Sequence, residues 1–407
     1  MAAVAQLLVR AKTLVTNAGA VAQNRVSFED LGVVRDAALL VTDGKIAFAG
    51  PRAGAEALVR GDVAEYDAQG VVVPGFIDAH AHPLFAGNRE PDFAARQRGD
   101  ASPLGMLYTV EQTRKALEHP DRFWPRVRER LAAILAHGTT TLETKTGYAL
   151  HRPGETDLLR MIDAHRDEPG LPRLIATFLG AHALPPEFFT EIDYVDYLID
   201  QCLPVAKADG AVYADAFCEP GFFSPEQTRR YLEAARAHGL RLRVHCDEMA
   251  FGHAAEMAAS LGVDAVDHCN CIREQDVDAI ADRGIVTVAC PATIAYLDLK
   301  QRAPVRALLE RGATVALASD FNPGTSPCFN LQTVAYFGRA IFGLSAAEAL
   351  YAVTRAAAQS LHLDAGTLRQ GADADFVELA LDSPDEFGWQ FGGNLARAVF
   401  RSGQRAA

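Results

Sequence analysis

The sequence predicts an α/β fold, in which a (β/α)8 TIM-like barrel is joined to a small β-sandwich domain built from both chain ends. From about residue 70 onward, apolar strand-like runs alternate with helical patterns at intervals of roughly 25 to 50 residues, as in repeated β-α units. Ionisable residues collect where these strands end, and both flanks instead show short alternating strands. The 407 residues, 49% of them hydrophobic, suffice for a barrel-sized core.

Eight barrel strands are expected, at residues 73–82, 140–146, 174–183, 211–219, 242–248, 265–269, 285–292 and 315–320. Helical patterns lie between them, at 122–137, 193–208, 225–238 and 305–311. Glycines mark the ends of several helices, at Gly138, Gly239, Gly284 and Gly312. We assign residues 69–365 to the barrel, and residues 1–68 plus 366–407 to the small domain.

Composition narrows the class of ligand. The formal net charge of −13 disfavours nucleic acid and anionic membranes as partners, so a small-molecule substrate is expected. The chain lacks an apolar run of about 18 residues, and its N-terminus lacks the features of a signal peptide. The seven cysteines are an odd number without C-x-x-C spacing, which favours small buried residues in a reducing compartment. We therefore expect a cytoplasmic protein.

A metal site is predicted at the barrel mouth. Residues 76–82 read Phe-Ile-Asp-Ala-His-Ala-His, which puts His80 and His82 on the same face of a strand end. His245 ends the fifth expected strand and Asp320 ends the eighth. Three imidazoles and one carboxylate suit zinc or iron, and an isolated H-x-H would be weak evidence without the other two residues. One metal ion per chain, Zn²⁺ or Fe²⁺/Fe³⁺, is the expectation.

Other strand ends supply acid–base groups. Glu248 lies three residues beyond His245 and can carry a proton from the attacking water to a leaving nitrogen, or alternatively form a loop salt bridge. His268 can polarise a carbonyl, or alternatively support the metal ligands without touching the substrate. Asp320 can share the proton transfer. A carboxylated Lys145 could bridge two metals, but one metal is favoured because Lys145 lies on the second expected strand, whereas the fourth ends in Glu219.

Two sets of motifs resemble known families. The stretch from Pro74 to His82, the later His245, His268 and Asp320, and the tail phrase Gly-Thr-Leu-Arg-Gln-Gly-Ala-Asp-Ala-Asp-Phe are similar to the amidohydrolase superfamily over nearly the whole chain. Narrower motifs resemble the imidazolonepropionase family: Phe85-Ala-Gly-Asn-Arg89, Lys145-Thr-Gly-Tyr148, Phe178-Leu-Gly-Ala-His182 and Asp320-Phe-Asn-Pro-Gly-Thr-Ser-Pro327. Cys246, Thr146, Ala149 and the Cys269-Asn-Cys271 segment depart from the usual family residues.

The resemblance implies a hydrolase of histidine degradation. Such an enzyme uses a metal-activated water to open the lactam C–N bond of 4-imidazolone-5-propanoate, which gives N-formimidoyl-L-glutamate. It also implies a homodimer, and a substrate site formed by Arg89, Tyr148, His182, Glu248, Asn322, Gly324 and Thr325. The planar fork of Arg89 suits the propanoate tail of that substrate.

Two other readings stay open at this point. The same metal set would serve an aminohydrolase (deaminase) of a purine, pyrimidine or other cyclic amidine. Arg89 discriminates, because a neutral base has no carboxylate for it to bind. A binding protein that has lost catalysis could also keep the barrel, although every candidate metal ligand is present here.

Overall fold

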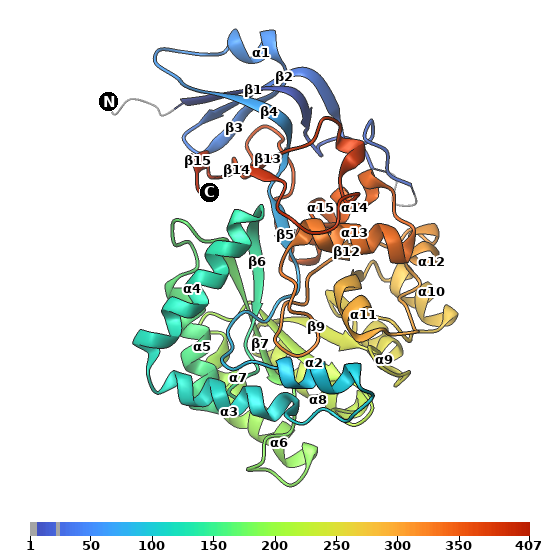
Figure 1. Ribbon diagram of the computed structural model, residues 1–407. Coiled ribbons are helices and arrows are strands. Elements are labelled where there is room, and N and C mark those ends of the chain that lie inside the picture. The colour runs from blue at the N-terminus through green and yellow to red at the C-terminus, as the bar shows by residue number, and fades with distance from the viewer. Residues whose placement is uncertain (1–5, 22–24) are drawn as a thin grey trace.

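The computed structural model describes residues 6–21 and 25–407; residues 1–5 and 22–24, which belong to the expected small domain, lie outside the described residues. Figure 1 shows two parts, a sheet formed by both chain ends and, below it, a barrel of strands surrounded by helices. The sheet covers the end at which the barrel strands begin. The opposite end of the barrel, where the strands finish, is therefore free to hold a site.

Eight parallel strands form the barrel, in the order of the chain. They are β5 (Phe76–Asp78), β6 (Thr139–Lys145), β7 (Arg173–Ala181), β8 (Tyr213–Cys218), β9 (Arg241–Cys246), β10 (Ala265–His268), β11 (Val286–Ala289) and β12 (Val315–Leu317). The predicted (β/α)8 barrel is thus confirmed, with strands that are mostly shorter than expected.

The first expected strand, 73–82, is wrong as a single element. Its start belongs to β4 (Ala64–Pro74) of the terminal sheet, and only Phe76–Asp78 pairs in the barrel. Gly75 separates the two strands, and its N–H donates to the carbonyl of Asp375 at 2.9 Å. A Cβ on Gly75 would lie 2.2 Å from Oγ1 of Thr140, so only glycine fits where the chain enters the barrel.

The barrel closes at its carboxyl end. The segment after β5 meets the segment after β12 through a parallel bridge between Ala81 and Phe321. The N–H of Asp320 donates to the carbonyl of His80, and the N–H of His82 to that of Phe321, both at 2.9 Å. The residues that join the first strand to the last are therefore also candidate metal ligands, which ties the geometry of the site to closure of the barrel.

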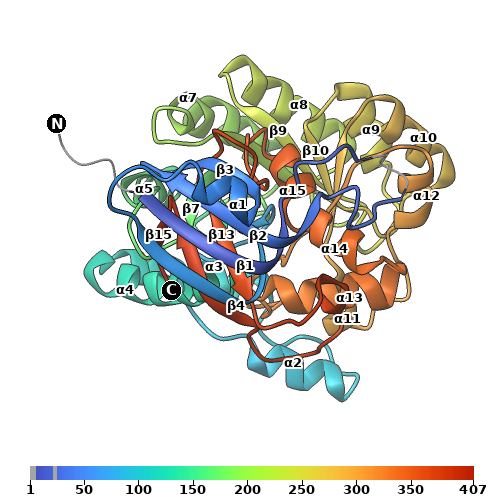
Figure 2. The same cartoon turned by 90° about the horizontal axis from the view of Figure 1, so that it is seen from above.

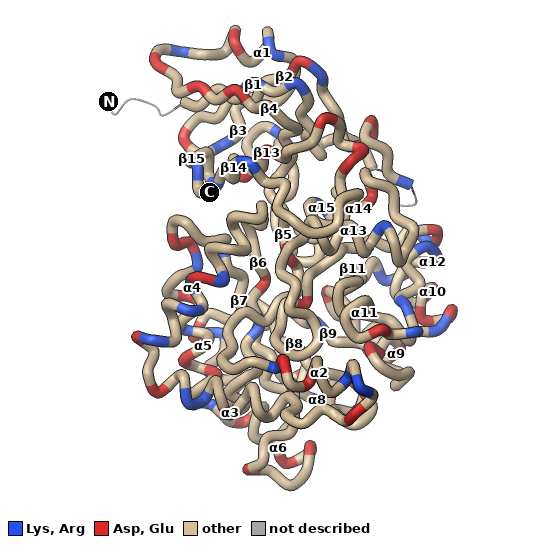
Figure 3. Tube along the Cα trace, viewed as in Figure 1, with Lys and Arg blue, Asp and Glu red and all other residues tan. Residues whose placement is uncertain are grey.

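Amphipathic helices cover the outside of the barrel (Figure 2). The longer ones are α3 (Gly105–Leu117), α4 (Pro120–Ala136), α5 (Arg152–Ala164), α8 (Pro225–Ala237), α9 (Ala254–Leu261), α10 (Glu274–Asp282) and α13 (Leu331–Phe342). The expected helix at 193–208 consists of α6 (Glu191–Tyr197), a π-helical turn at Leu198–Cys202 and α7 (Leu203–Ala206). Basic and acidic residues alternate along outer helices such as α3 and α4 (Figure 3).

Further helices complete the shell: α2 (Glu90–Gln97), α11 (Pro291–Leu297), α12 (Val305–Glu310), α14 (Ala346–Ala352) and α15 (Arg355–Ser360). Helix α1 (Arg52–Glu56) instead lies on the terminal sheet (Figure 1). Each expected terminal glycine adopts a positive φ, from 65° at Gly284 to 98° at Gly138. Among the described residues, none of the helices combines the length and apolar character needed to cross a membrane. All seven cysteines are free thiols.

The small domain is one continuous sheet of seven strands drawn from both chain ends, as expected for its origin. Its order is β15 (Gln404–Arg405), β14 (Ala396–Arg401), β13 (Phe376–Leu379), β4, β1 (Gln6–Val15), β2 (Val33–Thr42) and β3 (Lys45–Pro51). Val9, Phe376 and Phe400 share one apolar cluster, so the sheet wraps around a core of its own.

Candidate metal centre and active site

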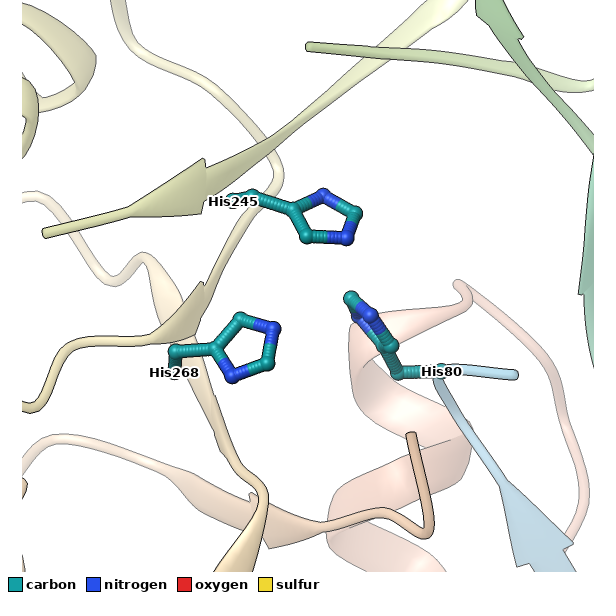
Figure 4. Close-up of side chains that lie close together, drawn as sticks. All are labelled: His80, His245 and His268. Carbon is teal, nitrogen blue, oxygen red and sulfur yellow. The ribbon is translucent and has the colours of Figure 1, made fainter. Parts of the chain in front are cut away.

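Four side chains expected to bind a metal converge where the strands end. Nε2 of His80 lies 3.3 Å from Nε2 of His82. Oδ1 of Asp320 lies 3.5 Å from Nε2 of His80 and 3.4 Å from Nε2 of His82. The ring of His245 is 4.5 Å from that of His80, between centroids. Figure 4 shows the rings of His80, His245 and His268 turned toward one another, with ligand atoms within 4.8 Å.

The protonation and burial of these groups fit a divalent cation. Burial lowers the pKa of His80 to about 3 and that of His82 to about 4, so both rings are neutral at pH 7 and offer lone pairs. Both ring nitrogens of His268 are buried and without a hydrogen-bond partner. Neutral imidazoles with a carboxylate are a donor set for zinc or iron. The structure thus brings together the residues that the sequence predicts as ligands.

Two buried carboxylates lie behind these histidines, and the sequence analysis missed both. Oδ2 of Asp267 is 2.7 Å from Nδ1 of His80, and Oδ2 of Asp215 is 3.0 Å from Nδ1 of His245. A carboxylate on Nδ1 fixes the ring orientation and leaves Nε2 for a metal. The available signal was a single aspartate within each of the two strands, β8 and β10, of which β10 also contains His268.

Two buried cations compensate these carboxylates. Nζ of Lys145 lies 2.7 Å from Asp215 and 2.9 Å from Glu143, while Nη2 of Arg243 lies 2.8 Å from Asp267. Burial alone would lower the pKa of Lys145, but the surrounding carboxylates raise it above its ordinary value. Lys145 is therefore an ammonium ion held in ion pairs, whereas a carboxylated lysine forms from a neutral amine.

The loop after β9 carries Glu248 into the site. Glu219 shapes this loop, because its carboxylate accepts N–H bonds from Glu248 at 2.8 Å, Met249 at 3.1 Å and Ala250 at 2.7 Å. Oε1 of Glu248 then lies 3.6 Å from Nδ1 of His268. Burial raises the pKa of Glu248, which brings it closer to neutral pH and suits a group that exchanges protons.

The seventh strand also contributes, although it ends without an ionisable residue. Thr293, at the start of α11, donates from Oγ1 to Oδ2 of Asp320 at 2.7 Å. The other oxygen of Asp320 faces His80 and His82. Thr293 therefore fixes the orientation of that carboxylate, a role for which a lone threonine offers no sequence signal.

A cavity of about 280 Å³ opens next to this cluster. Every residue expected to bind substrate lines it, and His82, His245, His268 and Asp320 do so as well. The ring of His182 stacks on that of His82, with centroids 5.4 Å apart, and its Nδ1 is 2.9 Å from the carbonyl of Gly147. The expected substrate residues are Arg89, Tyr148, His182, Glu248, Asn322, Gly324 and Thr325.

Asn322 organises the loop after β12. Its Oδ1 accepts the N–H groups of Gly324 and Thr325, each at 2.8 Å, and its Nδ2 donates to the carbonyl of Asp320 at 2.7 Å. These hydrogen bonds use both the oxygen and the nitrogen of the Asn322 side-chain amide. Asn322 thus shapes the cavity wall through the loop as well as lining it.

Comparison with known proteins agrees with this site. The profile described as the amidohydrolase family matches residues 71–405. An imidazolonepropionase of Solibacter usitatus is 37% identical over 98% of this chain and 97% of its own length. An imidazolonepropionase of Pseudomonas putida strain GB-1 is 38% identical over 91% of this chain and 94% of its own length. The chain belongs to the imidazolonepropionase family of amidohydrolases.

Solved structures show the same amidohydrolase fold. The zinc-bound atrazine chlorohydrolase TrzN of Arthrobacter aurescens superposes with a TM-score of 0.72 at 20% identity, over 98% of this chain and 94% of that one. A guanine deaminase of C. acetobutylicum with bound guanine has a TM-score of 0.69 at 16% identity, and the match covers 98% of this chain and 99% of that one. At such identities the likeness concerns the fold alone. Family membership makes this amidohydrolase a hydrolytic enzyme.

Proposed function

We propose that the enzyme hydrolyses the lactam C–N bond of 4-imidazolone-5-propanoate to N-formimidoyl-L-glutamate in histidine degradation. One observation carries the proposal: the histidine–aspartate cluster and the guanidinium of Arg89 line the same small cavity. A substrate held there would place a carboxylate against the arginine and a ring carbonyl near the histidines. Membership of the imidazolonepropionase family supports this assignment.

The metal would be one zinc or iron ion per chain, held by His80, His82, His245 and Asp320. When bound, such an ion lowers the pKa of a coordinated water toward about 7 and polarises a carbonyl oxygen. Asp267 and Asp215, each beside Nδ1 of one ring, would leave Nε2 of His80 and His245 available to such an ion.

Arg89 would bind the propanoate tail. The Nε atom of Arg89 pairs with Asp92, which leaves the two Nη atoms for a carboxylate in the cavity. Tyr148 and His182 border the same space and would contact the ring, while Asn322, Gly324 and Thr325 form the opposite loop. These contacts would hold the ring carbonyl in place for attack.

Glu248 is the proposed proton carrier. It would take a proton from the attacking water as the oxygen bonds to the carbonyl carbon, and deliver it to the ring nitrogen as the C–N bond breaks. The raised pKa of Glu248, caused by its burial, supports this double role. His268 would stabilise the developing oxyanion through a ring nitrogen that has no protein partner, and Asp320 would share the proton transfer.

The aminohydrolase alternative has less support. Deaminases are among the structural neighbours, but at 16% to 18% identity they report on the fold only. Arg89 in the cavity favours a substrate with a carboxylate over a neutral base.

A cytoplasmic homodimer is the proposed setting. Seven free cysteines support a reducing compartment. Trp389 and Phe391 lie two residues apart and are 66% and 65% exposed, and Phe391 contacts the rings of Tyr336 and Phe337, so an apolar surface for a second copy is proposed there.

The test follows the absorbance of 4-imidazolone-5-propanoate with the enzyme as purified, after chelation, and after zinc or iron is added back. Turnover that is lost on chelation and restored by metal is the expected result. Absence of turnover by a metal-loaded enzyme would overturn the proposed substrate and direct the search to cyclic amidines.

A further inference from the structure

A buried carboxylate lies directly behind the substrate-side arginine. Asp92, in the first turn of α2, is 0% exposed and forms an ion pair with Nε of Arg89. It also accepts the N–H of Leu104 at 2.9 Å and the N–H of Gly105 at 3.2 Å. These three donors use both carboxylate oxygens.

We propose that Asp92 is the positioning residue that sets the substrate-carboxylate specificity of this enzyme by holding Arg89 in one orientation; this inference rests on the proposed function. An arginine on a loop usually samples many rotamers, because its long side chain loses entropy when it is fixed. Here the ion pair to Nε fixes the guanidinium plane. The Nη1–Nη2 edge is the only edge of the fork left for a bidentate carboxylate.

The opposite side of the guanidinium is also confined. A Cβ on Gly324 would lie 3.0 Å from Nη1 of Arg89, so the loop after β12 approaches the arginine as closely as a glycine allows. Arg89 is only 11% exposed as a result. Asp92 on one side and Gly324 on the other leave the fork a single position.

Asp92 connects this clamp to the next helix. Leu104 and Gly105 begin α3, and Gly105 lines the cavity beside Ser102 and Met106. The same carboxylate therefore orients the arginine and holds the start of α3 against the cavity. Removal of its charge would leave buried N–H donors unpaired and free the guanidinium to turn.

The first experiment compares Asp92→Asn with the wild-type enzyme, using 4-imidazolone-5-propanoate. The amide keeps the shape of the side chain but removes the charge and replaces one of the two acceptor oxygens with an NH2 group, so the contact that orients Arg89 is weakened. We expect KM to rise about tenfold or more, since one weakened charge-assisted contact corresponds to roughly that factor, while kcat falls less than about threefold. Asp100→Asn, which changes an exposed carboxylate in the loop between α2 and α3, is the matched control and should leave both constants unchanged.

A double-mutant cycle separates positioning from general structural support. In an Arg89→Met background Asp92→Asn should lower kcat/KM by a much smaller factor than in the wild-type background, because the part of its effect that acts through the arginine is already lost. A structural role would instead lower kcat/KM equally in both backgrounds, and would overturn the proposal. A substrate analogue in which a propanamide replaces the propanoate tail provides a second test. Its kcat/KM should be the same with the wild-type enzyme and with Asp92→Asn.

The outcomes also separate this inference from the proposed function. If wild-type enzyme does not turn over the substrate, the proposed function fails. If wild-type enzyme is active and Asp92→Asn leaves KM unchanged, only the inference fails. Should Asp92→Asn not fold, Asp92→Ser keeps an oxygen acceptor in a smaller side chain and is compared in the same cycle.

Discussion

Oδ2 of Asp267 lies 2.7 Å from Nδ1 of His80, although the two residues are 187 positions apart in the chain. The other oxygen of Asp267 accepts from Nη2 of Arg243 at 2.8 Å. An Arg–Asp–His chain therefore runs from the barrel interior to the metal site, entirely among side chains that are 0% exposed.

This relationship predicts that Asp267→Asn weakens metal binding. An asparagine cannot accept from both His80 and Arg243 as the carboxylate does, so the ring loses its fixed orientation. We expect the zinc dissociation constant, measured by competition with a chelating dye, to rise about 10- to 100-fold. Asp282→Asn, at an exposed position on α10, is the control. A change of less than twofold for Asp267→Asn would contradict the orienting role.

Lys145 predicts a large effect on stability. Lys145→Met leaves the buried carboxylates of Asp215 and Glu143 without their ammonium partner. Breaking a buried ion pair in this way costs about 3 to 5 kcal/mol in the free energy of unfolding. The exposed pair between Lys115 and Glu111 provides the comparison, since Lys115→Met should leave the free energy of unfolding nearly unchanged. Denaturant titrations of both variants measure the difference, and equal losses would refute the prediction.

Gly324→Ala should impair substrate binding more than turnover. The added Cβ would lie 3.0 Å from Nη1 of Arg89, whose Nε is held by Asp92, so the guanidinium must shift by a few tenths of an ångström. Misplacement of a binding group by about 1 Å can cost roughly 100-fold, and a smaller shift predicts a rise in KM of about fivefold. Steady-state kinetics test this. An unchanged KM would mean that the arginine moves without consequence.

The buried histidines should make the metal-free enzyme less stable in mild acid. Burial lowers the pKa of His80 to about 3 and that of His82 to about 4, and lowers the pKa of His182 as well. The unfolded chain takes up these protons near pH 6.5, which the folded chain does not, so the free energy of unfolding falls as pH drops from about 6.5 toward 4.

One histidine acts in the opposite direction. Burial would lower the pKa of His245, but the carboxylate of Asp215 raises it, so this residue favours the folded state in acid. Among the described histidines, four have lowered pKa values, at His80, His82, His151 and His182, against one raised value, so the histidines together destabilise the folded state between pH 7 and pH 5. The carboxyl of Asp78, whose pKa burial raises to about 7, acts against this loss. Thermal melts of chelator-treated wild-type and His182→Gln protein isolate a histidine contribution: the melting temperature should decrease less between pH 7 and pH 5 in the variant, and an equal change in both would contradict the prediction.

The sequence was sufficient for the barrel and for the residues around the cavity. Strand-like runs alternate with helices, and histidines and acids stand at the strand ends, so the topology alone brings His80, His245 and Asp320 to one end. Motif resemblance located Arg89 and the loop at Asn322. These signals are local, because each depends on neighbours within a few residues.

Only the tertiary structure decided which groups support the site. Asp215 and Asp267 are visible in the sequence as single aspartates within strands, but no local pattern shows which residues they pair with, and Asp92 has the pattern of an ordinary first-turn helix residue. Their partners are set by the stagger of parallel strands and by the packing of α2 against α3, which bring together atoms far apart in the chain. The sequence by itself determined the fold class and the residues that ring the cavity. The relative placement of strands and loops decided how those residues are oriented, because orientation depends on contacts that no local pattern encodes.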